Sequence, residues 1–166
     1  MGWGKLATVE VFLVRHAIAE PYVAGQPDEE RALTAKGRSR FRLCVRGLDG
    51  LGVTFERLLH SPLLRAVQTA EELTPLLEGE SAVTPLLAQA PSVQLLAELD
   101  GLSSAALVGH EPWMSDLLGL LLLDQHAILP VGYKKGAVAW LRGDPRPGGM
   151  ELVAFLPPRV LVKFGR

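Results

Sequence analysis

Three short apolar runs in this chain each end in polar residues that could act on an anion. These endings are Arg15-His16, His60-Ser61-Pro62 followed by Arg65, and Gly109-His110. A neutral imidazole is a nucleophile near pH 7, because its unperturbed pKa is about 6.5. A guanidinium is a fixed cation whose forked donors match the oxygens of a phosphoryl group. These residue types suit attack on phosphorus by His16, with Arg15 holding the phosphoryl oxygens.

The apolar runs themselves must bring these side chains together. Residues 9–15, 55–59 and 105–108 are short, rich in apolar residues and bounded by polar ones, which predicts buried strands. The carboxyl ends of parallel strands lie along one edge of a sheet, where open α/β folds bind ligands. Two arginines and two histidines can therefore converge there. A helix capped by Ser61, with Pro62 at its start, would add backbone N–H donors.

Strands and helices alternate along most of the chain. The pattern predicts a loop over 17–32 and helices over about 35–48 (capped by Thr34), 63–77, 92–99 and 112–123. Further strands are expected at 82–87, 137–141, 151–156 and, at the end of the chain, 160–164. Alternation favours an α/β fold with a mostly parallel central sheet flanked by helices. The Gly/Pro-rich connector 142–149 predicts a closing antiparallel hairpin, and the 166 residues predict one domain, 1–166.

Composition narrows the class of protein. The chain is 48% hydrophobic and 21% charged, as in ordinary globular proteins, and its net charge of −1 favours neither nucleic acid nor an anionic membrane as a partner. Its one cysteine, Cys44, excludes an internal disulfide or thiolate cluster and is expected in the core. The N-terminus lacks a signal-peptide pattern, and the apolar run Leu117–Leu123 is too short to span a bilayer. We therefore expect a cytoplasmic protein.

Three motifs in the same order resemble those of the histidine phosphatase superfamily, also called phosphoglycerate mutase-like. Residues 13–17, Leu-Val-Arg-His-Ala, resemble its Arg-His-Gly/Ala signature. Residues 61–70, Ser-Pro-Leu-Leu-Arg-Ala-Val-Gln-Thr-Ala, resemble its second motif, Ser-Pro-x-x-Arg-Ala-x-Gln-Thr-Ala. Residues 107–112 resemble the third, around the second histidine. The resemblance covers about 9–123 and implies the family's three-layer sandwich.

One branch of that superfamily is favoured. Residues 31–37, Arg-Ala-Leu-Thr-Ala-Lys-Gly, are similar to the Arg-Pro-Leu-Thr-x-x-Gly segment of the short SixA-type phosphohistidine phosphatases, and 109–112 and 135–139 fit the same branch. The chain has no room for the cap insertions of larger mutases. Mutases usually carry an acidic proton donor between the second and third motifs, but residues 81–92 contain neither Asp nor Glu.

The resemblance implies a role for each site residue. His16 would form a phosphohistidine intermediate that water hydrolyses, while Arg15, Arg65 and His110 surround the equatorial oxygens. His110 would act best as an imidazolium, a form that a bound dianion favours. Because side chains supply the positive charge, neither metal nor cofactor is required.

The charged residues of the loop after the first motif allow two interpretations each. Arg31 either pairs with its acidic residues or joins the phosphate pocket, where Ser61 would also bind substrate. Asp28 and Glu20 are candidate proton donors, although an acidic loop can equally be a solvated one. Lys134 and Lys135 are expected to be surface charges, or else to steer a protein substrate.

The hypothesis that results is a metal-independent phosphatase acting on a phosphohistidine-bearing protein. A site without a positioned acid suits phosphohistidine, whose imidazole leaves easily once protonated, better than an alkyl ester. The alternatives are a small-molecule phosphomonoesterase of the same fold and a non-catalytic phosphate-binding module.

Overall fold

A computed structural model describes residues 8–166 and contains one six-stranded sheet. In sheet order its strands are β3 (Leu77–Val83), β2 (Phe55–His60), β4 (Ser104–Gly109), β1 (Val9–Arg15), β5 (Val138–Gly143) and β6 (Met150–Leu156). Strands β3, β2, β4 and β1 are parallel to one another, whereas β5 is antiparallel to both β1 and β6. The expected mostly parallel sheet with a closing antiparallel hairpin is confirmed.

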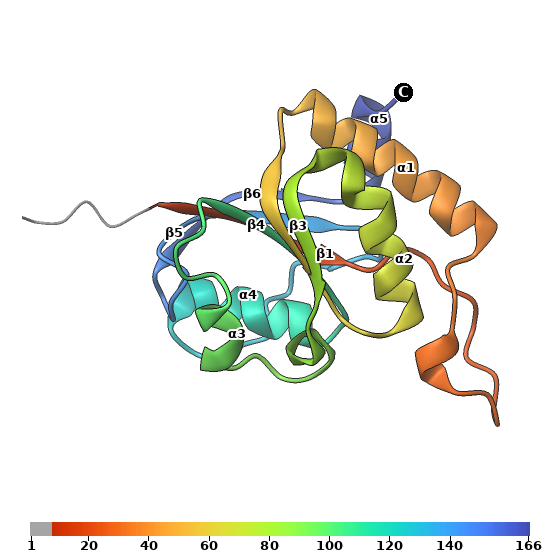
Figure 1. Cartoon of the computed structure of the whole chain (residues 1–166), viewed down its shortest axis with the longest axis horizontal. Coiled ribbons are helices and arrows are strands. Elements are labelled where there is room, and N and C mark those ends of the chain that lie inside the picture. The colour runs from red at the N-terminus through yellow and green to blue at the C-terminus, as the bar shows by residue number, and fades with distance from the viewer. Residues whose placement is uncertain (1–7) are drawn as a thin grey trace, which may run out of the picture.

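Helices cover both faces of this sheet (Figure 1). The helices are α1 (Ala35–Gly50), α2 (Leu64–Leu73), α3 (Val93–Ala97), α4 (Trp113–Leu123) and α5 (Pro158–Phe164). Helices α1, α2 and α5 pack on one face, and α3 and α4 pack on the other. This is the three-layer sandwich that the sequence predicts.

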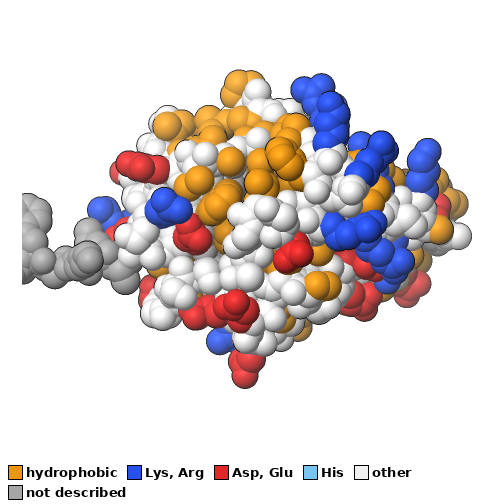
Figure 2. Space-filling view, turned by 90° about the horizontal axis from the view of Figure 1, so that it is seen from above, with side chains coloured by type: hydrophobic (Ala, Val, Ile, Leu, Met, Phe, Trp, Pro, Cys, Tyr) orange, Lys and Arg blue, Asp and Glu red, His pale blue; other side chains and the backbone are white. Residues whose placement is uncertain are grey.

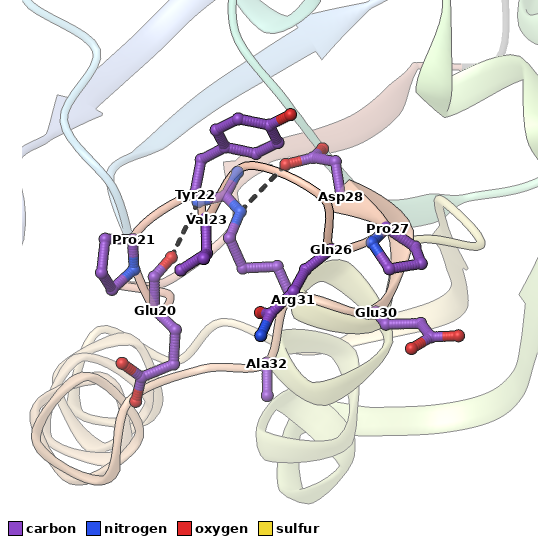
Figure 3. A pocket seen from close by; sticks show the side chains of 10 residues that line it. All are labelled: Glu20, Pro21, Tyr22, Val23, Gln26, Pro27, Asp28, Glu30, Arg31 and Ala32. Carbon is purple, nitrogen blue, oxygen red and sulfur yellow. Dashed lines mark hydrogen bonds and ion pairs between the residues drawn. The ribbon is translucent and has the colours of Figure 1, made fainter.

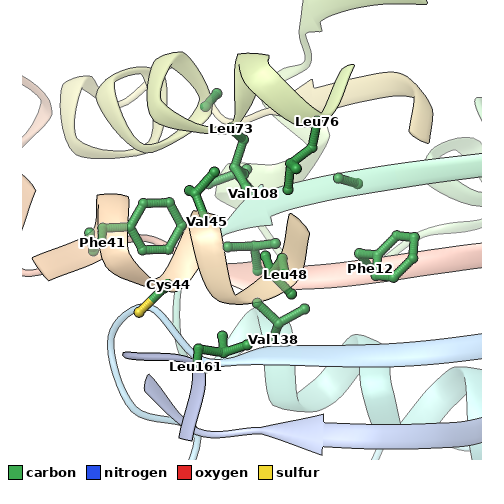
Figure 4. Packing of buried hydrophobic residues seen from close by; sticks show 14 of the residues in the cluster. Phe12, Phe41, Cys44, Val45, Leu48, Leu73, Leu76, Val108, Val138 and Leu161 are labelled. Atoms are coloured by element: carbon green, nitrogen blue, oxygen red, sulfur yellow. The ribbon is translucent and has the colours of Figure 1, made fainter. Parts of the chain in front are cut away.

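Strand β1 lies between the two layers and contributes to both. Phe12 and Val14 face the cluster formed with α1, α2 and α5, which Figure 4 shows around Phe41 and Leu48. Val11 and Leu13 alternate with them and pack against α4 on the other face. Because both faces are buried, the strand is a continuous apolar run instead of an alternating one.

The expected third strand is displaced along the chain. The helix predicted over 63–77 ends at Leu73, and a 3₁₀ turn over Thr74–Leu76 leads into β3. Pro75 explains this end, since proline lacks the N–H that a continuing helix needs. Strand β3 is an edge strand with mostly exposed side chains, so no apolar run marks it. The apolar residues expected as strand 82–87 mostly form a 3₁₀ turn, Pro85–Ala88.

The strand predicted at 160–164 is wrong, because these residues belong to helix α5. Pro158 occupies the first helical position, where its fixed φ favours a helix start. Leu161 and Val162 are buried in the cluster with α1. Gly47 of α1 permits the close approach, because a Cβ at that position would lie 2.2 Å from the carbonyl oxygen of Leu161.

The remaining expectations concern the chain's ends and its cysteine. Cys44 is buried in the core, and burial raises the pKa of its thiol to about 11. Between residues 8 and 166, no helix has the length and apolar character needed to cross a bilayer. The first residues, for which we predict no signal peptide, lie outside the described part of the chain.

Candidate active site

The carboxyl ends of three parallel strands meet at one edge of the sheet. Arg15 at the end of β1 is in register with Gly109 at the end of β4, and His60 of β2 is in register with Val108. Backbone hydrogen bonds continue past the strands: the His16 amide donates to the Gly109 carbonyl at 3.0 Å, and the Ser61 amide to the Val108 carbonyl at 3.0 Å. The polar residues after these strands are therefore held by the sheet itself.

His16 is buried, with 4% of its surface exposed, and its ring is oriented by the backbone. Its Nδ1 lies 2.7 Å from the carbonyl oxygen of Ala17, which can only accept a hydrogen bond. Nδ1 therefore carries the proton, and Nε2 keeps its lone pair. Burial, reinforced by the nearby charges of Arg65 and Arg15, lowers the pKa of His16 to about 3. The imidazole is neutral, as a nucleophile must be.

The second histidine lies beside the first. The ring centroids of His16 and His110 are 5.1 Å apart, and His110 Nε2 is 2.7 Å from Ser61 Oγ. Burial, followed by the charge of Arg65, lowers the pKa of His110 to about 4. In the ligand-free site His110 is therefore neutral, and the imidazolium form expected from the family resemblance requires a bound anion.

Ser61 contacts His110 but does not cap a helix. Helix α2 begins one turn later, with Leu63 at the N-cap position, so the expectation that Ser61 is the cap is wrong. The hydroxyl of Ser61 accepts a hydrogen bond from the Leu63 amide at 3.2 Å. Its own proton remains free to point at the histidine, which places Ser61 as a group that orients His110.

Both arginines use only part of their hydrogen-bonding capacity. Arg15 donates from a terminal nitrogen to the Tyr133 carbonyl at 2.6 Å, and Arg65 donates to the backbone and side chain of Asp28 at 2.8 and 2.9 Å. The Nε atoms of both arginines and Nδ1 of His110 are buried without a partner. In the part of the chain that the structure describes, Trp140 Nε1 is the one other buried side-chain atom of this kind.

Buried polar groups in native proteins are normally hydrogen-bonded, so three unpartnered ones at meeting strand ends need an explanation. A polyoxygen anion would supply acceptors to both guanidinium groups and to the second histidine. It would also offset the cost of burying two cations near each other. The site is therefore suited to an oxyanion such as a phosphoryl group.

The loop between β1 and α1 is held by Arg31, whose side chain crosses its interior (Figure 3). Arg31 donates to Asp28 Oδ1 at 3.0 Å and to the Glu20 carbonyl oxygen at 3.0 Å. A cavity of about 590 Å³ lies inside this loop. Of the two expectations for Arg31, the structure has it paired with the acidic loop.

The two candidate proton donors, Glu20 and Asp28, differ in their exposure and in their partners. The Glu20 carboxylate is exposed and points away from the Arg31 guanidinium (Figure 3). Asp28 bridges Arg31 and Arg65. Partial burial alone would raise the pKa of Asp28, but the charges and hydrogen bonds of Arg65 and Arg31 outweigh it and lower the pKa. Asp28 is thus held as a carboxylate in this arrangement.

Three further residues support the site, and sequence reasoning did not single them out. Thr69 Oγ1 accepts from the Ala17 amide at 3.0 Å and donates to the Arg65 carbonyl at 2.6 Å, which ties the end of β1 to α2. Glu111 accepts from the backbone and hydroxyl of Ser115 at the start of α4. Tyr133 donates to the Leu13 carbonyl while its own carbonyl holds Arg15. The position of Thr69 one helical turn after Arg65 was a detectable signal.

Comparison with known proteins places the chain in a family. Residues 11–89 match the model of the histidine phosphatase superfamily (branch 1). The chain is 34% identical over 121 residues to the phosphohistidine phosphatase SixA of Escherichia coli K12, a match that covers 68% of this chain and 74% of that protein. It is 35% identical over 89 residues to the mouse mitochondrial serine/threonine-protein phosphatase PGAM5, of which it covers 30%.

Solved structures agree with the sequence matches. The structure of the protein histidine phosphatase SixA complexed with tungstate superposes with a TM-score of 0.78 at 30% identity, covering 92% of this chain and 99% of that one. The similarity therefore extends over most of the chain, beyond the residues that the family model matches. The chain belongs to the histidine phosphatase superfamily, within its SixA-type branch.

Proposed function

We propose that this phosphatase hydrolyses phosphohistidine on a protein, with His16 as the nucleophile. The observation that carries the proposal is the hydrogen bond from His16 Nδ1 to the Ala17 carbonyl, which leaves the Nε2 lone pair available. The low pKa of the buried ring keeps that lone pair unprotonated well below neutral pH. The similarity to the phosphohistidine phosphatase SixA supports phosphohistidine as the substrate class.

In the first step, His16 Nε2 forms a bond to phosphorus while the bond between phosphorus and the substrate's imidazole nitrogen breaks. The electron pair of that bond goes to the leaving nitrogen, and the substrate imidazole departs neutral when its distal nitrogen carries a proton. Arg15, Arg65 and His110 would stabilise the charge on the three equatorial oxygens, where phosphoryl transfer concentrates it.

In the second step, water attacks the phosphorylated His16. Because Nδ1 keeps its proton in the hydrogen bond to Ala17, the ring of the intermediate is cationic and becomes a neutral leaving group when the P–N bond breaks. The water oxygen bonds to phosphorus, the electron pair of the P–N bond returns to Nε2, and a water proton passes to a phosphate oxygen or to solvent as inorganic phosphate is released, which returns His16 to its starting tautomer. The same backbone contact therefore serves both steps.

The absence of a ready acid among the two loop candidates favours phosphohistidine over an alkyl ester. An alkoxide is a poor leaving group and needs a proton in the transition state. Asp28 is an ionised partner of two arginines, and the Glu20 carboxylate points away from Arg31. An imidazole leaving group needs no such donor from the enzyme.

The proposal is tested by trapping the intermediate and by comparing substrates. Wild-type protein, His16→Ala and the exposed-histidine control His126→Ala are mixed with a ³²P-labelled phosphohistidine protein and quenched in alkali, which preserves phosphohistidine. Label should appear on wild type and on the control but not on His16→Ala, whose turnover should fall on the order of 10³-fold or more. Wild-type turnover by His16→Ala, or a strong preference of wild type for p-nitrophenyl phosphate, would contradict the proposal.

A further inference from the structure

A second cavity, of about 710 Å³, is lined in part by Arg15 and by other positively charged side chains. Its lining includes five cationic side chains, Arg15, Arg40, Lys134, Lys135 and Arg159, and no carboxylate. They come from β1, α1, the segment before β5, and the start of α5. Segments far apart in the sequence thus place like charges around one opening.

These charges have no ion-pair partner within the described residues, although the more distant carboxylate of Glu111 acts on Arg15. Several other arginines on the surface pair with carboxylates, such as Arg38 and Arg42 with Glu72. None of the five cations that line the cavity forms an ion pair among residues 8–166. Burial, and then the neighbouring arginines, lower the pKa of the half-buried Lys135, in keeping with a net positive field there. Such a field attracts an acidic group from solution.

The cavity also has an apolar part. Ile18, Val131, Pro157 and Pro158 line it between the cations, and 37% of the Ile18 surface is exposed. A small inorganic anion gains nothing from these side chains, whereas a protein segment can bury apolar groups there and pair its carboxylates with the rim. Figure 2 shows Lys and Arg side chains gathered towards the right-hand end of the face seen there, with carboxylates beside some of them.

The loop that precedes α1 carries charge of the opposite sign. Glu20, Glu29 and Glu30 are exposed on the loop that precedes α1. The basic cavity and this acidic loop therefore present charges of opposite sign to an approaching partner. A partner with an acidic patch on one side of its phosphorylated residue would be attracted by the cavity and repelled by the loop, which orients it.

We propose that this basic cavity docks an acidic segment next to the phosphohistidine of the protein substrate. The inference rests on the proposed function, because it takes a phosphohistidine protein as the substrate. A phosphohistidine side chain is short, and its phosphoryl group must reach the buried His16. The residues that flank the phosphohistidine must therefore lie against the rim. The rim beside Arg15 selects those flanking residues by charge, while His16 and the arginines recognise the phosphoryl group itself.

The test compares two synthetic phosphohistidine peptides, one flanked by glutamates and one by lysines, with free phosphohistidine as the small substrate. The variant is the double charge reversal Lys134→Glu with Arg159→Glu, both at exposed positions outside the catalytic residues. The matched control is Arg46→Glu, an exposed arginine on α1 that does not line the cavity. We expect kcat/KM for the glutamate peptide to exceed that for the lysine peptide in wild type, more at low salt than at high salt.

In the double variant, kcat/KM for the glutamate peptide should fall roughly tenfold or more, with free phosphohistidine unchanged and the control close to wild type. Equal rates on both peptides in wild type, or an unaltered preference in the double variant, would refute docking. A matching loss on free phosphohistidine would also refute it, since the cations would then act on the phosphoryl group or a small ligand. If wild type hydrolyses neither peptide nor free phosphohistidine, the proposed function itself fails.

Discussion

Acidification should destabilise this protein partly through its two buried site histidines. In the folded chain the pKa of His16 is about 3 and that of His110 about 4, whereas both are near 6.5 when unfolded. Below pH 6.5 the unfolded chain therefore binds more protons than the folded chain. The free energy of unfolding therefore does not suffer from these histidines above about pH 6.5, and it falls as the pH drops from there towards the folded pKa values of about 4 and about 3.

The size of the effect follows from the same values. Each unit of pH below the unfolded pKa costs about 1.4 kcal/mol per histidine, as long as the folded ring stays neutral. At about pH 4.5 this amounts to roughly 2.5 kcal/mol for each histidine and roughly 5 kcal/mol for both, relative to pH 7. A domain of this size is stable by about 5–15 kcal/mol in total, so the loss should be easy to measure.

The assay is urea unfolding at about pH 7 and about pH 4.5 for wild type, His16→Gln, His110→Gln, the double variant and the exposed control His126→Gln. Each single site variant should remove about half of the histidine-dependent loss, and the double variant nearly all of it, while His126→Gln should follow wild type. Acid effects on carboxylates are common to all five proteins and cancel in the comparison. If the double variant loses as much stability on acidification as wild type, the two rings are not held neutral by burial and the reasoning is wrong.

Three further predictions follow from single contacts. Gly47→Ala should lower the free energy of unfolding in urea by roughly 2 kcal/mol or more, because the added Cβ would clash with the Leu161 carbonyl. The control Gly50→Ala should cost little, because its added Cβ would lie 3.9 Å from the nearest atom outside its own helix backbone. Equal losses in the two variants would contradict this packing. Thr69→Val should cost about 1–3 kcal/mol by leaving the buried Ala17 amide unpaired, and Thr69→Ser should restore most of it. Asp28→Asn should free Arg65 for ligand, so calorimetric titration should show inorganic phosphate binding roughly threefold to tenfold tighter. Weaker phosphate binding by that variant would show instead that Asp28 supports the anion site.

The residues of the candidate site were accessible from the sequence because each follows a recognisable strand. A short apolar run that ends in Arg-His, and another followed by Ser-Pro and an arginine one turn later, carry local information about both structure and chemistry. Parallel strands then dictate that their ends meet. The family motifs added the order of the three segments and the SixA-type branch, which the similarity to known SixA proteins confirms.

Edge and terminal elements were harder to predict, because their side chains reflect contacts with distant segments. Strand β3 is polar since it lies at the edge of the sheet, and α5 is a helix since its apolar residues pack on α1. The role of Arg31 was open for the same reason. Nothing local to 28–31 decides whether that guanidinium binds its own loop or a phosphate.

What the sequence determined by itself is the set of chemical groups and the strand ends that carry them, since both depend on short-range pattern. The tertiary structure decided the protonation, the tautomer and the ion-pair partners of these groups. Burial sets both histidines neutral, the Ala17 carbonyl selects the tautomer of His16, and Asp28 occupies part of Arg65. It also gathered four further cations, none of them ion-paired among the described residues, from three separate segments beside Arg15. Charge and protonation depend on every neighbour within a few ångströms, whatever its distance along the chain, and only the folded arrangement specifies those neighbours.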